Sequence, residues 1–277
     1  MAGVVLELPR SVVLALWLQE VGGQMTSDPE AVRHATAAVQ HDDEPHTVHG
    51  LDDEQHLGAT LVELVGTWAG EAWTAAAGLP VPGDPAGVPA VIGSAAATAG
   101  ECVLVHSGAG TYAAIPRVEV FGSALEPGHT VQWEISRVAD WRTALIGQVG
   151  TLTDAERDLR GALAQATRAI TALDVARWRP EAATEIASLR GDSDPGWRLP
   201  PAVDARRARV LLSAARLRAI VALATADDGG ALNLWQADQR STALAEVDRA
   251  ARRAMSAATL PPALLRGPEP YPPRTER

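Results

Sequence analysis

Apolar positions in the first part of the chain recur with the period of an α-helix. Pro9 stands where the first turn of a helix tolerates proline, and Gly22-Gly23 stands where a helix stops, so the mostly apolar run between them predicts a buried helix. The sequence SDPE at 27–30 has the pattern of a capping box and predicts a second helix. A third helix is predicted over about 57–77, with Gly78 as its stop.

The period changes to two between residues 102 and 138. Cys102–Val105, Thr111–Phe121 and Val131–Val138 predict strands, and the last alternates apolar with polar residues, as in a sheet with one face in solvent. Glycine-containing turns separate these segments, so a three-stranded antiparallel meander is the simplest topology. Residues 78–93 are half Gly and Pro, which predicts either a lid or an ordered loop laid over the surface.

After Asp140 the pattern becomes helical again. The sequence TDAE at 153–156 is a second capping box. Behind it, apolar residues spaced by four and three predict a bundle or coiled-coil seam: Leu159, Leu163, Ala166, Ile170 and Leu173. Two long helices, at about 203–226 and from the break at 227–230 to about 258, predict an antiparallel αα-hairpin.

Together these elements predict an α+β fold with two domains. Residues 1–140 are expected to form N-terminal helices with a small antiparallel sheet, and residues 141–259 a C-terminal antiparallel helical bundle that includes a shorter helix at Pro180–Leu189. The tail at 260–277 is rich in proline and is predicted to be disordered. No segment approaches the ~18 apolar residues of a membrane span and no signal peptide is recognised, so we expect a soluble cytoplasmic protein.

The composition narrows the chemistry, because the chain contains no lysine and all 24 basic side chains are arginine. Schiff bases and lysine-dependent phosphate sites are therefore excluded. The single cysteine, Cys102, lies four residues before His106 on a predicted strand, so the two side chains would be ~13 Å apart and we expect Cys102 to be a core residue. No motif identifies an activity, and a non-enzymatic role is favoured.

One segment could bind a metal. Residues 41–56 contain four of the seven histidines and six carboxylates, a competent ligand set for zinc, manganese or iron. His46 and His49 would be the ligands, completed by Asp43, Glu44 or Asp53. The alternative is a solvated acidic loop, which is favoured because no established metal-binding spacing is present. No cofactor is predicted beyond this divalent metal.

The charge is distributed unevenly, and one predicted cluster carries much of it. Residues 1–150 hold 5 arginines and 18 acidic residues, a net charge of −13, whereas residues 151–277 hold 19 and 16, a net charge of +3. A hairpin that turns at Gly229 would gather six guanidinium groups ~35 Å from its turn: Arg206, Arg207, Arg209, Arg249, Arg252 and Arg253.

Like charges gathered in this way need a negative partner. An internal partner is favoured, such as the acidic runs at 42–44 or 52–54, because Arg–carboxylate pairs commonly tie domains together. An external anion is the alternative: a nucleic acid, a phosphorylated ligand or an acidic protein.

Three segments resemble a protein family of high-GC Gram-positive, actinobacterial-type bacteria with no established activity. They are LPRSVVLALWLQ at 8–19, DDEPHTVHG at 42–50 and DDGGALNLWQADQRSTALAEVDRAARRAM at 227–255. The loop at 82–84 and the sequence AGE at 99–101 also fit. The resemblance implies a cytoplasmic bacterial origin and assigns no catalytic residue.

We therefore expect an interaction or scaffold protein that docks a protein partner or a second copy through its C-terminal helical hairpin. Metal or small-ligand binding at residues 41–56, with a hydrolase as one form of it, is the first alternative. Nucleic-acid binding through the arginine cluster is the second, and it is disfavoured by the net charge of −10 and a pI of about 5.2.

Overall fold

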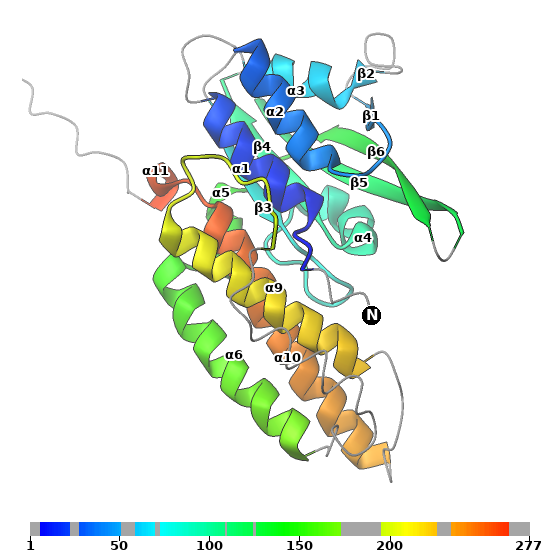
Figure 1. The fold of residues 1–277 in the computed structure, drawn as a ribbon. Coiled ribbons are helices and arrows are strands. Elements are labelled where there is room, and N and C mark those ends of the chain that lie inside the picture. The colour runs from blue at the N-terminus through cyan, green and yellow to red at the C-terminus, as the bar shows by residue number, and fades with distance from the viewer. Residues whose placement is uncertain are drawn as a thin grey trace, which may run out of the picture.

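The computed structural model describes residues 6–22, 28–50, 59–69, 73–108, 110–123, 126–172, 195–225 and 234–265 (Figure 1). Over these residues the fold is α+β, as predicted. A six-stranded sheet has the strand order β2-β1-β6-β5-β4-β3. Helices cover the sheet, and three long helices extend away from it, as Figure 1 shows.

The predicted meander is present within a larger sheet. It consists of β4 (Cys102–Ser107), β5 (Gly110–Gly122) and β6 (Pro127–Arg137), all antiparallel. The expectation of a small, purely antiparallel sheet was wrong, because β1 (Thr47–His49) pairs in parallel with β6 and carries the short β2 (Ala59–Thr60) at the edge. On the other side, β3 (Thr74–Gly78) pairs with β4.

Three helices pack beside the sheet in the N-terminal part. α1 (Arg10–Gly22) contacts β3 and β4, and most of its side chains are buried, which explains its nearly continuous apolar sequence. α2 (Pro29–Gln40) begins at Asp28, whose carboxylate accepts the N–H of Glu30 at 2.9 Å, so the cap lies one residue after the predicted Ser27. α3 (Leu61–Ala69) packs on α2.

The predicted helix over 57–77 was wrong in its second half, where the structure has β3. Ala75, Ala76 and Ala77 are fully buried, and their small side chains let α1 and α10 approach the strand closely. The N–H of Ala77 donates to Oγ1 of Thr259 at 2.9 Å. Alanine is the best helix former, but here strand pairing and close packing override that preference.

The Gly/Pro-rich segment forms an ordered surface loop, which is one of the two predicted alternatives. Val81 and Asp84 exchange backbone hydrogen bonds at 3.0 and 2.9 Å and make a tight turn. The loop leads into α4 (Ala90–Ala99), a helix that the sequence analysis did not predict. After β6 the chain continues into α5 (Arg142–Val149).

The long helices are α6 (Leu152–Ala172), α9 (Ala205–Thr225) and α10 (Leu234–Thr259), and they lie side by side in Figure 1. α6 begins with a reciprocal cap between Thr151 and Asp154, two residues before the predicted box. Along the predicted seam Leu159 is buried, whereas Leu163 is 53% exposed and so departs from the predicted pattern. The side chains of the later seam residues lie outside the described part of the chain. None of the described helices is long and apolar enough to cross a membrane.

Residues 260–265, at the start of the tail that was predicted to be disordered, have a defined structure. Leu260 is buried, and α11 (Pro262–Leu265) follows it. Leu260 packs in the core that the long helices share with the sheet, so hydrophobic burial outweighs the local effect of the prolines. The rest of the predicted tail and the predicted helix at Pro180–Leu189 lie outside the described residues.

Candidate functional site

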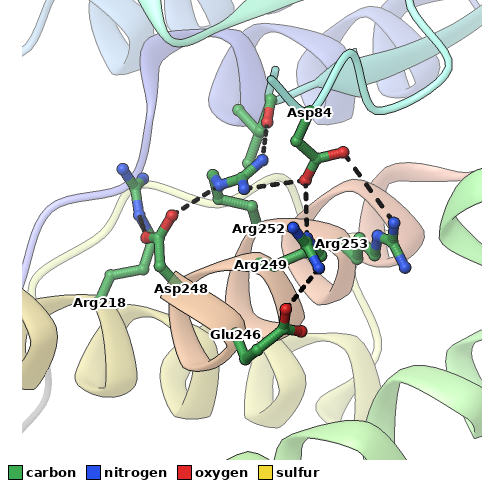
Figure 2. Close-up of polar contacts among 8 residues, drawn as sticks. Asp84, Arg218, Glu246, Asp248, Arg249, Arg252 and Arg253 are labelled. Carbon is green, nitrogen blue, oxygen red and sulfur yellow. Dashed lines mark hydrogen bonds and ion pairs between the residues drawn. The ribbon is translucent and has the colours of Figure 1, made fainter. Parts of the chain in front are cut away.

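The arginines at the end of α10 point toward the loop that follows β3. Arg249, Arg252 and Arg253 are three and four residues apart, so they share one side of the helix. Figure 2 shows all three guanidinium groups gathered around the carboxylate of Asp84. We call Arg249, Arg252 and Arg253 the inner arginines.

Arg252 is the centre of this arrangement and is only 3% exposed. Its Nε donates to Oδ2 of Asp248 at 2.7 Å, and its Nη2 donates to Oδ2 of Asp84 at 3.0 Å. Its Nη1 donates to the carbonyl oxygen of Leu79 at 2.7 Å. The buried charge is therefore paired on two sides and hydrogen-bonded on a third, as burial of a guanidinium group requires.

The other two inner arginines complete the surroundings of Asp84. Nε of Arg249 lies 3.4 Å from Oδ2 of Asp84, while its Nη1 pairs with Glu246 at 2.7 Å. Nη2 of Arg253 lies 4.0 Å from Oδ1. Burial raises the pKa of Asp84, but the hydrogen bond from Arg252 and the charges of Arg253 and Arg249 outweigh it, so the pKa is lowered overall.

This geometry agrees with an internal counter-charge for the inner arginines, but the carboxylate is not one of those suggested from the sequence. Of the run at 42–44, Asp43 pairs with Arg10 instead. The run at 52–54 lies outside the described residues. Asp84 is a single acidic residue in a turn between prolines, and no local pattern distinguishes such a residue as a partner for distant arginines.

The remaining predicted arginines lie at the start of α9. Nε and Nη2 of Arg206 donate to the two carboxylate oxygens of Glu156 at 2.8 and 2.9 Å, which joins α9 to α6. Arg207 is half-buried and donates to the carbonyl oxygen of Leu260, and burial lowers its pKa. Arg209 is exposed.

Glu156 is surrounded by three exposed arginines: Arg160, Arg206 and Arg209. The hydrogen bond from Arg206 lowers the pKa of Glu156, and the charges of all three arginines act in the same direction. We call Arg160, Arg206 and Arg209 the outer arginines. Asp204, at the start of α9, also acts on Arg206, so three guanidinium groups face two carboxylates here. This surface of α6 and α9 keeps a small excess of positive charge in a chain whose net charge is −10.

The structure brings two of the five predicted metal ligands together. Asp43 Oδ2 accepts from Nε of Arg10 at 2.6 Å and lies 3.2 Å from Nε2 of His46. His46 is fully buried, and Nε1 of Trp133 donates to its Nδ1 at 3.1 Å. Because an indole N–H can only donate, Nδ1 must be the acceptor and Nε2 carries the proton that Asp43 accepts.

This pairing fixes the state of His46 and occupies both of its ring nitrogens. Burial lowers its pKa, and the charge of Arg10 acts in the same direction, while Asp43 opposes the shift without reversing it. For Asp43, burial raises the pKa, but the hydrogen bond and charge of Arg10 and the contact with His46 lower it overall. A metal would have to displace Trp133 or Asp43 from the ring to bind His46.

Neither His49 nor Glu44 joins this pair in a group that could hold a metal ion. His49 is on β1, opposite Glu134 of β6, and Glu44 is exposed, with its N–H donating to the carbonyl of His129 at 3.0 Å. Asp53 lies outside the described residues. Over the part of the chain that the structure describes, no group of three or more His, Cys, Asp or Glu side chains is arranged to hold a metal ion. Metal binding therefore stays a prediction.

Two other buried groups, Cys102 and Glu101, belong to the core and not to a reactive site. Cys102 is fully buried on β4, and burial raises the pKa of its thiol to about 12, so it is not activated as a nucleophile. Glu101 is also buried, which raises its pKa, and its Oε2 accepts the N–H of Ser11 at 2.7 Å. Glu101 thus satisfies a backbone donor in the first turn of α1.

The fold and these sites define an α+β protein in which the inner arginines are paired with Asp84 inside the molecule. The chain belongs to the Rv1486c-like protein family: residues 11–149 match the model of its N-terminal domain and residues 153–256 the model of its C-terminal domain. These matches support the resemblance to an actinobacterial-type family that the sequence suggested. No curated protein matches the chain, and neither does any solved structure.

Proposed function

We propose that this protein is a non-enzymatic interaction protein that docks an acidic protein partner on its outer arginines. The observation that carries the proposal is the excess of exposed positive charge where Arg160, Arg206 and Arg209 outnumber the carboxylates of Glu156 and Asp204. The docking surface belongs to the C-terminal helices and lies on α6 and the first turns of α9. We further propose that the interaction takes place in the cytoplasm.

The inner arginines differ from the outer ones because all three lie around Asp84, and Arg252 is also buried. Arg252 is bound on three sides inside the molecule, and Arg249 is shared between Asp84 and Glu246. If a partner bound Arg252, Asp84 and the Leu79 carbonyl would lose their hydrogen bonds from this arginine. Buried polar groups without a partner cost free energy. The outer arginines can bind a partner's carboxylates without breaking a buried contact.

Two buried reactive side chains, Cys102 and His46, also favour binding over catalysis. The thiol of Cys102 is buried with a raised pKa, and both ring nitrogens of His46 have partners. Catalysis requires a nucleophile or a base within reach of a substrate. A protein that binds a partner through surface charge needs no nucleophile and no base.

The test compares capture of partners by two variants of equal charge. Arg160→Glu with Arg209→Glu removes the positive excess and leaves the Arg206–Glu156 pair in place. Arg33→Glu with Arg137→Glu makes the same charge change in the N-terminal part, where both side chains are exposed. Each protein is used to capture partners from nuclease-treated native cytoplasm, and thermal unfolding confirms that both variants are folded.

We expect the wild type and the control pair to retain the same stoichiometric protein and the outer pair to lose at least about nine-tenths of it, which is a tenfold weaker affinity or about 1.4 kcal/mol. Retention of that protein by the outer pair would contradict the proposal. If the captured protein disappeared after nuclease treatment but was kept by the charge-reversed variant, nucleic-acid binding would be favoured.

A further inference from the structure

One of the outer arginines, Arg206, already binds a carboxylate of its own chain. Its Nε and Nη2 donate to Oε1 and Oε2 of Glu156 at 2.8 and 2.9 Å, which is a bidentate pair. Nη2 also donates to Oγ1 of Thr153 at 2.9 Å. Both hydrogens of Nη2 and the hydrogen of Nε are therefore engaged within the chain, and the two hydrogens of Nη1 remain.

This occupancy limits how a partner can bind Arg206. A carboxylate that binds a guanidinium group in the bidentate geometry needs one hydrogen from each of two neighbouring nitrogens. Nη2 belongs to both edges of the group at which this is possible, and Glu156 and Thr153 use its two hydrogens. A partner's carboxylate can thus form a bidentate pair with Arg206 only by displacing one of these two side chains.

The pair between Arg206 and Glu156 lies at the surface, where such an exchange is easy. The two side chains are 44% and 30% exposed. Exposed ion pairs contribute little to stability, because both groups are well hydrated when they separate. Leu159, Ala162 and Val210 are buried in the core that α6 and α9 share, so the packing of these helices does not depend on the pair.

Asp204, the other carboxylate near the outer arginines, has a different role. Its Oδ1 accepts the backbone N–H groups of Arg206 and Arg207 at 2.8 and 2.9 Å, so it caps the first turn of α9. The pKa of Arg206 is raised chiefly by its hydrogen bond to Glu156, and the charge of Asp204 is a smaller cause. Glu156 is therefore the carboxylate that a partner would have to replace.

The neighbouring arginines favour exchange with a segment that carries several acidic residues. Arg160 lies one turn beyond Glu156 on α6, Arg209 lies one turn beyond Arg206 on α9, and the charges of both act on Glu156. A displaced Glu156 would thus stay near positive charge. Because Glu156 is tethered in the same chain, its effective concentration is high, and a partner overcomes it by binding Arg160 and Arg209 at the same time.

We propose that Glu156 is an internal competitor at the docking surface: it occupies Arg206 in the free protein, and a glutamate or aspartate side chain of the acidic partner displaces it on docking. This inference rests on the proposed docking function and adds the regulation of that site. The competitor makes docking selective, because a single carboxylate does not displace Glu156, whereas a segment with several carboxylates does.

The test measures binding of a fluorescently labelled oligoglutamate peptide to the purified full chain by fluorescence anisotropy at low salt. Glu156→Gln removes the competing charge and keeps the size of the side chain. Asp158→Asn is the matched control, because it removes the same charge from an exposed position on another side of α6. Arg206→Gln, alone and combined with Glu156→Gln, completes a double-mutant cycle, and thermal unfolding confirms that each variant is folded.

We expect Glu156→Gln to bind the peptide at least about fivefold more tightly than the wild type, and Asp158→Asn to change the affinity much less. In the Arg206→Gln background the gain from Glu156→Gln should be clearly smaller, because no guanidinium group is released there. The competitor role would be overturned by the absence of a gain, by an equal gain in Asp158→Asn, or by a gain that Arg206→Gln leaves intact.

The variant Arg160→Glu with Arg209→Glu separates this inference from the docking function. If that variant loses the peptide and Glu156→Gln gives no gain, docking stands and competition by Glu156 is wrong. If that variant keeps the peptide, or if neither the wild type nor Glu156→Gln binds it, the docking function is wrong and the competitor role fails with it.

Discussion

His46 lies fully buried between the indole of Trp133 and the carboxylate of Asp43, and these partners determine its protonation state. The sequence of the histidine-rich segment suggested metal ligands. A sequence shows which side chains could coordinate a metal, but it does not show which hydrogen-bond partners those side chains already have. Trp133 is far from His46 in the chain and was the residue that pattern reasoning missed. The indole N–H of Trp133 makes Nδ1 of His46 a hydrogen-bond acceptor.

The lowered pKa of His46 predicts a direction for the pH dependence of stability. The unfolded chain binds a proton near pH 6.5, whereas folded His46 binds it only at lower pH, so the free energy of unfolding falls as the pH drops below about 6.5. Above this value the contribution is complete. His46→Gln should flatten the dependence between pH 7.5 and 5.5, as measured by urea unfolding.

The matched control for this prediction is His34→Gln, which removes an exposed histidine of α2. It should leave the wild-type dependence in place. If His46→Gln kept the full loss of stability on acidification, the buried histidine would not be its source.

At the level of elements, the loop between β3 and α4 is held by the helix that it crosses. Gly87 has a φ of +79°, and a Cβ at this position would lie 2.8 Å from the backbone oxygen of Ala144 and from Cα of Leu145 in α5. Gly83 in the same loop has a φ of +83° but no atom within 4 Å of its Cβ position. The two glycines share a backbone conformation and differ in the space around them.

We therefore predict different costs for the same substitution in this loop. Gly83→Ala should lower the free energy of unfolding by about 1 kcal/mol, which is the cost of the left-handed conformation alone. Gly87→Ala should lower it by about 3 kcal/mol, because the new methyl group also displaces the backbone of α5. Urea unfolding of both variants measures the difference, and equal costs would mean that the loop does not rest on α5.

The elements that the sequence predicted well are those whose signals are local. α1 lies between Pro9 and Gly22 as expected, and the three strands of the meander keep their predicted places. β3 and α4 were not predicted, because alanine-rich segments take the structure that their neighbours impose. β1 is a strand of three residues that pairs with β6, more than eighty residues later, so its partner has no local signal.

At the scale of the whole molecule, the two parts of the chain meet through charge as well as through a shared core. Asp84 lies in the segment that matches the N-terminal domain of the family and Arg252 in the segment that matches the C-terminal domain. The uneven charge of the two halves predicted an internal attraction of this kind. It could not identify Asp84, because the turn that presents this carboxylate is positioned only by tertiary packing.

The separation of inner from outer arginines is the central claim of this account, and a double-mutant cycle on Arg252 and Asp84 tests it most directly. Arg252→Met and Asp84→Asn should each cost about 3 kcal/mol in urea unfolding at neutral pH, because each leaves a buried group without its partner. The double variant should cost about 2 kcal/mol less than the sum of the two. Costs that add within about 0.5 kcal/mol would show that the inner arginines do not join the two parts and would leave them available to a partner.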